Sequence, residues 1–196
     1  QAGWSRGEYR ESALTFNAMG FNCMAVDLRS GSAINGVKNE THKQASKDGL
    51  STKYVDAYQD IEASVEFARE SFAKGKLIIL GSSYSSALVL KYAGDHQDVD
   101  GVLSFSPGEY FTGQGKSKTW ITDAAAKIKV PVFITSAKKE KESWWGIYQA
   151  IPSEQKTYFL PETSGNHGSR ALWEKFDDSP YYWAAVEAFL EMNFQL

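Results

Sequence analysis

The sequence has a single cysteine, Cys23, which excludes a disulfide within the chain and a cysteine-based metal cluster. It also lacks an apolar run near the roughly 20 residues that a membrane-spanning helix needs. Basic charge is not in excess, because 21 scattered Lys and Arg face 24 Asp and Glu and leave a net charge of −3. Together, these absences argue against nucleic acid or an anionic membrane surface as a partner.

The remaining composition is that of an ordinary globular protein, with 42% hydrophobic and 23% charged residues. A chain of 196 residues can bury the core of one domain, so we expect a single domain over residues 1–196. The chain begins at Gln1 rather than Met, which indicates a processed or truncated product. The sequence leaves localisation open, since one cysteine fits both the cytoplasm and a disulfide-free periplasmic protein.

Strand-like and helix-like segments alternate along the chain. Short apolar runs predict strands at residues 21–28, 76–81, 99–107, 130–137 and 156–161. Apolar residues at helical spacing predict helices at residues 54–75, 85–96, 120–129, 141–151 and 179–194. We expect Gly75 to cap the first of these helices and Ser179 to be the N-cap of the last. The alternation predicts an α/β fold with a mostly parallel sheet flanked by helices.

The stretch LIILGSSYSSALVL places four serines between a strand-like run and a helix-like run. A serine nucleophile at a tight strand-to-helix turn needs small residues two positions before and after it, as in the G-x-S-x-G nucleophile elbow. Ser83 meets this need, with Gly81 before it and Ser85 after it. Ser82 and Ser86 would have a large side chain two positions earlier, and Ser85 lies a turn into the helix. Ser83 is therefore the predicted nucleophile.

A serine nucleophile needs a base, and the sequence offers three histidines. His167 follows the last predicted strand in the loop TSGNHGSRALW, whose small residues allow an imidazole to reach the edge of the sheet. His96 ends a predicted helix, where a cation suits the helix dipole. His42 lies in the charged segment NETHKQ and is expected to be solvated. His167 is thus the predicted base.

The acid that orients the base is expected between Ser83 and His167 in the sequence. Glu140 and Glu142 follow one predicted strand, and Glu109 follows another. Position alone leaves all three open, with Glu140 preferred.

These segments together resemble the α/β-hydrolase fold and, within it, the lid-poor esterases that are similar to dienelactone hydrolase. The resemblance rests on GSSYS as the elbow, PVFITSAKKE as a strand with the acid turn, and GNHGSRALW as the histidine loop, and it covers nearly the whole chain. It implies a triad of Ser83, Glu140 and His167, with Glu140 where the family usually has Asp. Dienelactone hydrolases proper carry Cys in place of Ser83.

By the same resemblance, the opening QAGWSRGEYRESALTFNAMGF corresponds to the oxyanion loop and the first helix after the family's strand three. The backbone N–H groups of Ala2 (or Gln1) and Tyr84 would then hold the oxyanion. The family's strand three lies between the strands predicted at residues 21–28 and 76–81, and no earlier residue of the chain supplies it. We therefore expect upstream residues that form two or three strands, and an N-terminally incomplete domain.

The sequence thus predicts a serine hydrolase that cleaves a small-molecule carboxylic ester through an acyl-enzyme, without a metal or a cofactor. Two alternatives stay open: a peptide or amide hydrolase with the same triad, and a non-catalytic binding protein of the same fold. Segment 108–120, GEYFTGQGKSKTW, is the candidate for a small lid or pocket wall. The oligomeric state is not specified by the sequence.

Overall fold

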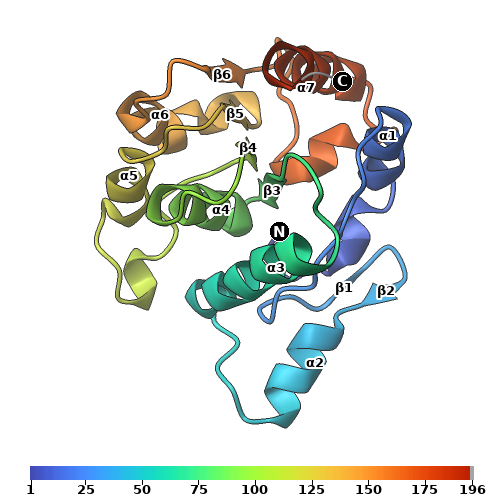
Figure 1. Ribbon diagram of the computed structural model, residues 1–196, viewed down its shortest axis with the longest axis vertical. Coiled ribbons are helices and arrows are strands. Elements are labelled where there is room, and N and C mark those ends of the chain that lie inside the picture. The colour runs from blue at the N-terminus through green and yellow to red at the C-terminus, as the bar shows by residue number, and fades with distance from the viewer. Residues whose placement is uncertain (195–196) are drawn as a thin grey trace. The chain divides into compact units, whose positions relative to one another are not determined.

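The computed structural model describes residues 1–194 and separates the chain into two compact units, Gln1–Gly75 and Lys76–Leu196 (Figure 1). A single domain over residues 1–196 stays a prediction. Within the described residues, no helix is both long enough and apolar enough to cross a membrane.

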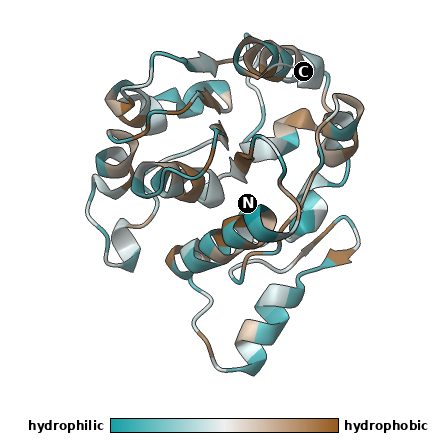
Figure 2. Cartoon of the chain, viewed as in Figure 1, coloured by the Kyte–Doolittle hydropathy of each residue, from teal (hydrophilic) through white to brown (hydrophobic). Residues whose placement is uncertain are grey.

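The second unit is built on a four-stranded sheet of order β3-β4-β5-β6, in which all neighbouring strands are parallel. The strands are β3 (Ile78–Ser82), β4 (Gly101–Phe105), β5 (Val132–Thr135) and β6 (Lys156–Phe159). Every residue of β4 and β5 is buried, which explains why the sequence shows continuous apolar runs there. β3 is likewise among the hydrophobic segments in Figure 2. The predicted α/β fold with a mostly parallel sheet is confirmed.

Helices connect these strands in the predicted alternation. They are α4 (Tyr84–Asp95), α5 (Trp120–Ala125), α6 (Lys141–Ala150) and α7 (Ser179–Asn193), with short 3-10 turns at Thr112–Gln114, Lys138–Glu140 and Gly168–Leu172. α4 packs on β3 and β4, and the ring of Phe189 on α7 lies 5.6 Å from that of Phe133 on β5. His96 is the C-cap residue of α4, as predicted, and its ring stacks on Tyr92.

The first unit contains mostly helices and irregular segments. Its elements are a 3-10 turn at Arg6–Tyr9, α1 (Ser12–Ala18), β1 (Ala33–Ile34), β2 (Val37–Lys38), α2 (Glu40–Lys47), a 3-10 turn at Tyr54–Ala57, and α3 (Tyr58–Ser71). β1 and β2 form an antiparallel hairpin. Its turn residues, Asn35 and Gly36, have φ of 52° and 75°, the left-handed values that a two-residue hairpin turn requires.

The strand predicted at residues 21–28 is wrong: this segment forms no strand. An extended segment becomes a strand only when a neighbour satisfies its backbone N–H and C=O groups. Neither sheet of the described residues includes this segment, and Met24 within it is 42% exposed. An apolar run without a pairing partner therefore stays irregular.

The predicted C-cap at Gly75 is also wrong, because α3 ends at Ser71 and Phe72 is its C-cap residue. The Phe72 ring packs edge-on against Phe67, with 5.4 Å between the ring centroids. The amide of Ala73 closes the helix by donating to the carbonyl of Ala68 at 2.8 Å. Apolar packing and this backbone bond end the helix before the glycine is reached.

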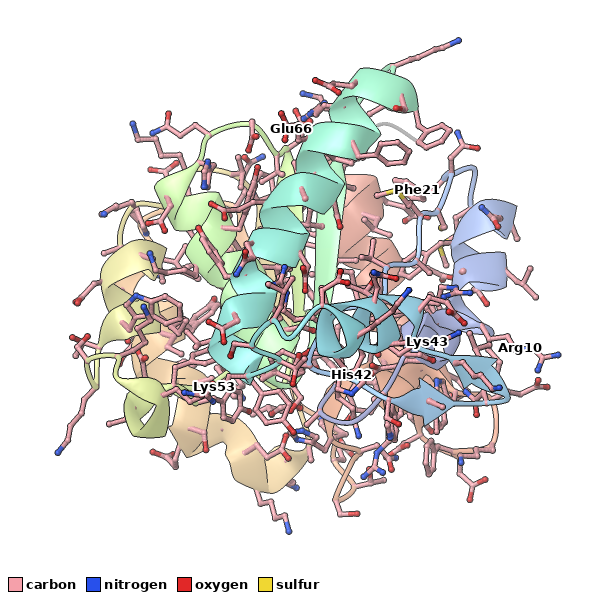
Figure 3. The ribbon with its side chains drawn as sticks, turned by 90° about the horizontal axis from the view of Figure 1, so that it is seen from below. Arg10, Phe21, His42, Lys43, Lys53 and Glu66 are labelled. Carbon is pink, nitrogen blue, oxygen red and sulfur yellow. The ribbon has the colours of Figure 1, made fainter. Side chains whose placement is uncertain are left out.

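α2 forms in the charged segment that holds His42, where no helix was predicted, and Figure 2 shows it as mostly hydrophilic. Asn39 is its N-cap and accepts a hydrogen bond from the amide of His42 at 2.7 Å. The Nδ1 of His42, a residue labelled in Figure 3, lies 2.6 Å from the carbonyl oxygen of Arg29. His42 is thus half-buried and bonded rather than solvated, which corrects the prediction.

Candidate active site

The strand-to-helix turn between β3 and α4 holds Ser83 in a strained conformation, with φ of 57° and ψ of −125°. A non-glycine residue at such angles is costly and is typical of functional sites. Gly81 makes the turn possible, because a Cβ there would lie 2.6 Å from the Cα of Ser86 on α4. Glycine is therefore needed two positions before Ser83, because the backbone of α4 leaves no room there for a Cβ.

The other serines of the cluster take the places expected for them: Ser82 ends β3, and Ser85 and Ser86 lie in α4. Ser85 has a further role in the turn. Its hydroxyl accepts from the amide of Ser82 and donates to the Ser82 carbonyl, both at 2.9 Å. Ser85, which stands where the elbow pattern has its second glycine, thus links the first turn of α4 to the end of β3 by two hydrogen bonds.

The structure brings Ser83, His167 and Glu140 into one hydrogen-bonded chain. The Oγ of Ser83 lies 2.8 Å from Nε2 of His167, and Nδ1 of His167 lies 2.7 Å from Oε1 of Glu140. Ser83 is 8% exposed, whereas the side chains of His167 and Glu140 are 32% and 21% exposed. A nucleophile, an imidazole and a carboxylate in this order form the geometry that activates a serine hydroxyl.

The loop that carries His167 is anchored to α7. The hydroxyl of Tyr182 donates to the carbonyl of Ser136 at 3.1 Å and accepts from the amide of Asn166 at 3.3 Å. Burial chiefly raises the pKa of Tyr182 to about 12, so the phenol stays neutral and can make both bonds. Gly165 has φ of 70°, and a Cβ there would lie 2.6 Å from Cγ of Pro161, so glycine is needed where the loop turns.

Asp178 anchors the same loop and corrects a predicted cap. It is the N-cap residue of α7, where Ser179 was expected, but its side chain makes no capping bond. Its carboxylate instead accepts from the hydroxyl of Thr163 at 2.8 Å and from the side-chain amide of Asn166 at 3.1 Å. A residue placed to cap the helix is used to hold the histidine loop.

Of the three candidate acids, Glu140 is the one whose carboxylate contacts His167. The carboxylate of Glu109 instead accepts from the amides of Ile121 and Thr122 at the start of α5, at 3.0 and 2.8 Å. Glu142 is exposed in the first turn of α6. Glu109 therefore serves as a helix-terminal acceptor, in line with the preference of carboxylates for helix N-termini.

Glu140 keeps its negative charge although it is partly buried. Burial by itself would raise the pKa of this carboxyl. Hydrogen bonds from His167, Ser106 and the amide of Ala137, together with the charge of His167, outweigh that effect and lower the pKa below its ordinary value. The carboxylate is therefore ready to orient an imidazole and stabilise the imidazolium form.

Sequence reasoning assigned no site role to two further residues, Ser106 and Tyr110. The hydroxyl of Ser106 donates to Oε2 of Glu140 at 2.8 Å, and the hydroxyl of Tyr110 donates to the carbonyl of Ser106 at 2.6 Å. Burial, reinforced by the charge of Glu140 and opposed by a hydrogen bond with Ser83, raises the pKa of Tyr110 to about 12. The available signal was their position at the carboxyl end of the strand run at 99–107, where Ser106 is within the last residues and Tyr110 follows.

The two predicted oxyanion donors fall in different units. Tyr84 is the first residue of α4, next to Ser83, where helix amides have no acceptor within the helix. Ala2 lies at the start of the first unit. Their role as a pair stays a prediction.

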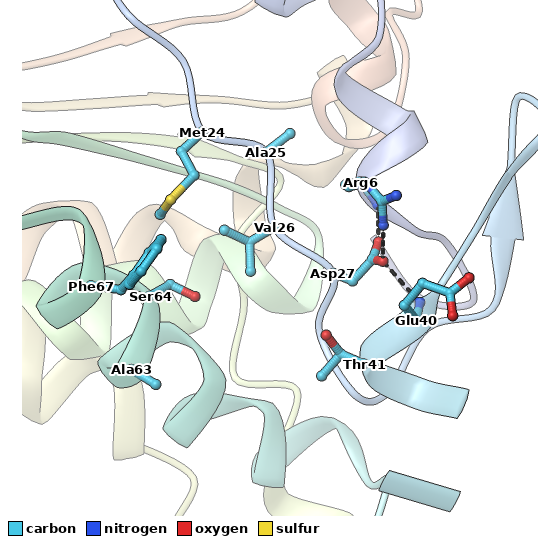
Figure 4. A pocket seen from close by; sticks show the side chains of 10 residues that line it. All are labelled: Arg6, Met24, Ala25, Val26, Asp27, Glu40, Thr41, Ala63, Ser64 and Phe67. Carbon is cyan, nitrogen blue, oxygen red and sulfur yellow. Dashed lines mark hydrogen bonds and ion pairs between the residues drawn. The ribbon is translucent and has the colours of Figure 1, made fainter. Parts of the chain in front are cut away.

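The first unit has a pocket of about 390 Å³ of its own (Figure 4). Met24, Val26 and Phe67 supply its apolar lining. At its polar end, Asp27 is paired with Arg6 and also accepts from the amide of Glu40 at 2.9 Å. The contacts of Asp27 with Arg6 and with the amide of Glu40 thus join three separate stretches of the first unit. No group of three or more His, Cys, Asp or Glu that could hold a metal ion occurs among the residues described.

A model of one protein family, serine aminopeptidase, S33, matches residues 2–113, which is more than half of the chain. The chain belongs to the serine aminopeptidase S33 family. The matched residues of this S33 family member include Ser83, while Glu140 and His167 lie beyond them. The family is one of serine hydrolases with the α/β-hydrolase fold, so the resemblance and the enzyme class predicted from the sequence are confirmed at the level of the family.

Solved structures similar to this S33 family member share its fold. One of two metagenome-derived lipolytic enzymes superimposes with a TM-score of 0.71 at 13% identity, covering 98% of this chain and 91% of the other. A dienelactone hydrolase from Anabaena variabilis gives 0.66 at 11% identity, covering 98% and 82%. An esterase from Pyrococcus furiosus gives 0.55 at 16% identity; the match covers 69% of this chain and only 62% of the esterase, less than two thirds of its length. No curated protein matches the chain by sequence.

Proposed function

We propose that this protein is a serine hydrolase that cleaves carboxylic esters through an acyl-enzyme, with Ser83, His167 and Glu140 as its triad. The observation that carries the proposal is the continuous chain of contacts from Ser83 Oγ through both ring nitrogens of His167 to Glu140, at 2.8 and 2.7 Å. The strained backbone at Ser83 supports it, because the strain projects the hydroxyl from the end of β3.

In the acylation step, Ser83 Oγ attacks the ester carbonyl while Nε2 of His167 takes its proton. Glu140 holds Nδ1 and stabilises the imidazolium that forms. The tetrahedral intermediate then collapses, and His167 returns the proton to the departing alcohol. The acyl group stays on Ser83 as an ester.

In the second step, His167 removes a proton from a water molecule, which attacks the acyl carbonyl. The bond between the acyl carbon and Ser83 Oγ then breaks, His167 returns the proton to Oγ, and the carboxylic acid is released. The negative oxygen of each tetrahedral intermediate needs hydrogen-bond donors. We propose that the backbone N–H of Tyr84 is one such donor; loss of one donor typically costs about 100- to 1,000-fold in kcat. The steps use side chains and backbone groups of the chain itself.

A second candidate function is hydrolysis of an amide bond, because the matched family is described as serine aminopeptidase. The same triad can serve both reactions. An ester is preferred because an alcohol leaves more readily than an amine, and because solved structures with this fold include esterases and lipolytic enzymes.

A fluorophosphonate probe tests the nucleophile. We expect it to label the full chain at one residue, and labelling to disappear in Ser83→Ala while persisting in the neighbouring Ser82→Ala. Esterase activity of Ser83→Ala should fall by at least about 10⁴-fold. An unlabelled wild-type protein would instead favour a non-catalytic binding protein, and labelling that survives Ser83→Ala would place the nucleophile elsewhere.

Two series of substrates then distinguish ester hydrolysis from amide hydrolysis. p-Nitrophenyl esters of graded acyl length and aminoacyl or peptidyl p-nitroanilides are compared by kcat/KM on the same preparation. We expect turnover of the esters and a rate at background for the anilides. The reverse order would make the aminopeptidase description apply to this chain as well as to its family.

A further inference from the structure

Ser106 uses every polar group it has at the point where β4 ends. Its amide donates to the carbonyl of Thr135 on β5 at 2.7 Å, and its carbonyl accepts from the hydroxyl of Tyr110 at 2.6 Å. Its φ is 61°, a left-handed value that serine rarely adopts, and it is 1% exposed. Such a strained conformation persists only where the surrounding contacts impose it, so the hydrogen bonds of this buried serine hold it in place.

The hydroxyl of Ser106 links the acid to the backbone beside the base. It donates to Oε2 of Glu140 at 2.8 Å and accepts from the amide of Gly168 at 2.8 Å. Glu140 contacts His167 through its other oxygen, Oε1, and Gly168 directly follows His167 in the chain. Ser106 therefore holds both partners of the contact between Glu140 and His167: it bonds to the carboxylate of Glu140 and to the backbone next to His167.

We propose that Ser106 is a positioning residue of the active site, whose hydroxyl fixes the carboxylate of Glu140 and the backbone of the His167 loop relative to each other. This inference rests on the proposed triad and adds a fourth residue to it. Ser106 acts through Glu140 and His167 and does not touch the reacting atoms. Its effect is expected on the rate of the chemical step rather than on substrate binding, because it is buried behind the triad.

The hydroxyl also supports the charge of Glu140. Its hydrogen bond is one of the interactions that lower the pKa of Glu140 against the opposing effect of burial. The titratable groups that face Glu140 are His167, Tyr110 and Tyr182, from three different segments. Loss of the Ser106 donor raises the pKa of Glu140, so protonation of this carboxylate removes its support of His167 at a higher pH than in wild type, and activity is lost at higher pH on acidification.

The test compares Ser106→Ala with Ser104→Ala, using kinetics on a p-nitrophenyl ester. Ser104 is the matched control: it is a buried serine on β4, two residues before Ser106, and its hydroxyl donates to the carbonyl of Ser86 at 3.2 Å. For Ser106→Ala we expect kcat to fall about 10- to 100-fold, the effect typical of an outer hydrogen-bond partner, with KM within about twofold of wild type. The acid limb of the pH–rate profile should move upward in Ser106→Ala and stay in place in Ser104→Ala.

Two further variants keep the test valid if Ser106→Ala folds poorly. Ser106→Gly removes the hydroxyl but suits the positive φ, so it should fold well and show the same loss of kcat. In a double-mutant cycle, Ser106→Ala should cost much less in a Glu140→Ala background than in wild type, because the carboxylate that it holds is gone. A purely structural role of Ser106 would give additive losses.

Spectroscopy supplies a readout that does not need turnover. The proton that His167 Nδ1 shares with Glu140 should give a downfield NMR signal, and this signal should shift or broaden in Ser106→Ala but not in Ser104→Ala. A fluorophosphonate-reactive wild type with unchanged kcat, pH profile and NMR signal in Ser106→Ala would overturn the role of Ser106 alone. A wild type that the probe does not label would overturn the proposed function and this inference together.

Discussion

The two compact units of the chain use their apolar residues differently. In Lys76–Leu196, apolar runs form parallel strands whose backbone groups are paired and whose side chains are buried, as in β4 and β5. In Gln1–Gly75, the equally apolar segment 21–28 has no pairing partner, and the only paired strands described there have two residues each. The same kind of sequence thus gives a strand in one unit and an irregular segment in the other.

The first unit contains an ion pair that is nearly buried. The guanidinium of Arg29 binds Asp60 with Nε and Nη2, at 2.9 and 2.6 Å from Oδ1, and the amide of Arg29 donates to the same carboxylate at 2.8 Å. Their side chains are 15% and 9% exposed. In the second unit, the paired strands are stabilised by burial of their side chains. In the first unit, the ion pair of Arg29 and Asp60 joins the segment before α2 to α3. The two units should therefore respond differently to single substitutions.

The largest effect is expected for Gly81→Ala in the second unit. The added Cβ would meet the backbone of α4, which cannot move without displacing Ser83. We expect the free energy of unfolding to fall by about 3 kcal/mol, the upper part of the usual range for overpacking. Esterase activity of the folded fraction should fall about 100-fold, since small misplacements of a nucleophile have effects of this size. Urea unfolding and ester kinetics measure the two quantities.

Gly146→Ala is the matched control for this substitution. Gly146 lies inside α6, and a Cβ there would meet no atom within 4 Å. Alanine is the better helix former, so the free energy of unfolding should rise by about 1 kcal/mol. If Gly81→Ala behaved like Gly146→Ala, the steric account of the elbow would be wrong.

A smaller effect is expected for Arg29→Ala in the first unit. The substitution leaves the mostly buried carboxylate of Asp60 without its ionic partner. We expect a loss of about 2 kcal/mol, as for removal of one partner of a charged hydrogen bond. Hydrogen exchange should locate the lost protection in α3 rather than in the parallel sheet.

Lys43→Ala is the control for the ion pair, because Lys43 and its partner Glu40 are 75% and 59% exposed. Such surface pairs contribute little, and the variant should unfold within about 0.5 kcal/mol of wild type. If Arg29→Ala and Lys43→Ala lowered the free energy of unfolding equally, burial would not determine how much the two ion pairs contribute to stability.

The smallest effect concerns acid stability of the second unit. The pKa of Glu140 is lower in the folded protein than its ordinary value of 4.5. The hydrogen bonds of its carboxylate therefore contribute fully above about pH 4.5 and are lost as the pH falls through the folded pKa. We expect the stability difference between wild type and Glu140→Gln to narrow on going from pH 6 to pH 3 in urea titrations. A constant difference over this range would show that the carboxylate is not stabilised by folding.

Much of the second unit could be predicted from sequence because its elements are locally encoded. The four runs that became β3 to β6 are short, apolar and bounded by turn residues, and each forms a strand near its predicted place. The prediction was wrong for residues 21–28 because a strand also depends on a neighbour, which local sequence does not reveal. The helix ends at Ser71 and Asp178 differed from the predicted ones because the local packing of Phe72 on Phe67, and the contact of Asp178 with Thr163, took precedence over capping preferences.

For the candidate site, the pattern of small residues was enough to single out Ser83, since Gly81 meets a steric need that the elbow imposes on any sequence. Sequence preferred Glu140 but left Glu109 and Glu142 open, because all three follow strands. Only the three-dimensional path of the loops decides which carboxylate reaches Nδ1 of His167. The catalytic roles themselves stay a prediction until Ser83 is tested.

The sequence by itself determined the alternation of strands and helices, and the turn at GSSYS with its one sterically suitable serine. Both depend on residue size and polarity over a few neighbouring positions. The tertiary structure decided the rest: that Ser106, 62 residues before Gly168, bridges Glu140 to the histidine loop, and that Asp178 holds that loop rather than capping α7. Such contacts join residues far apart in the chain, so they exist only once the sheet has placed the strand ends side by side.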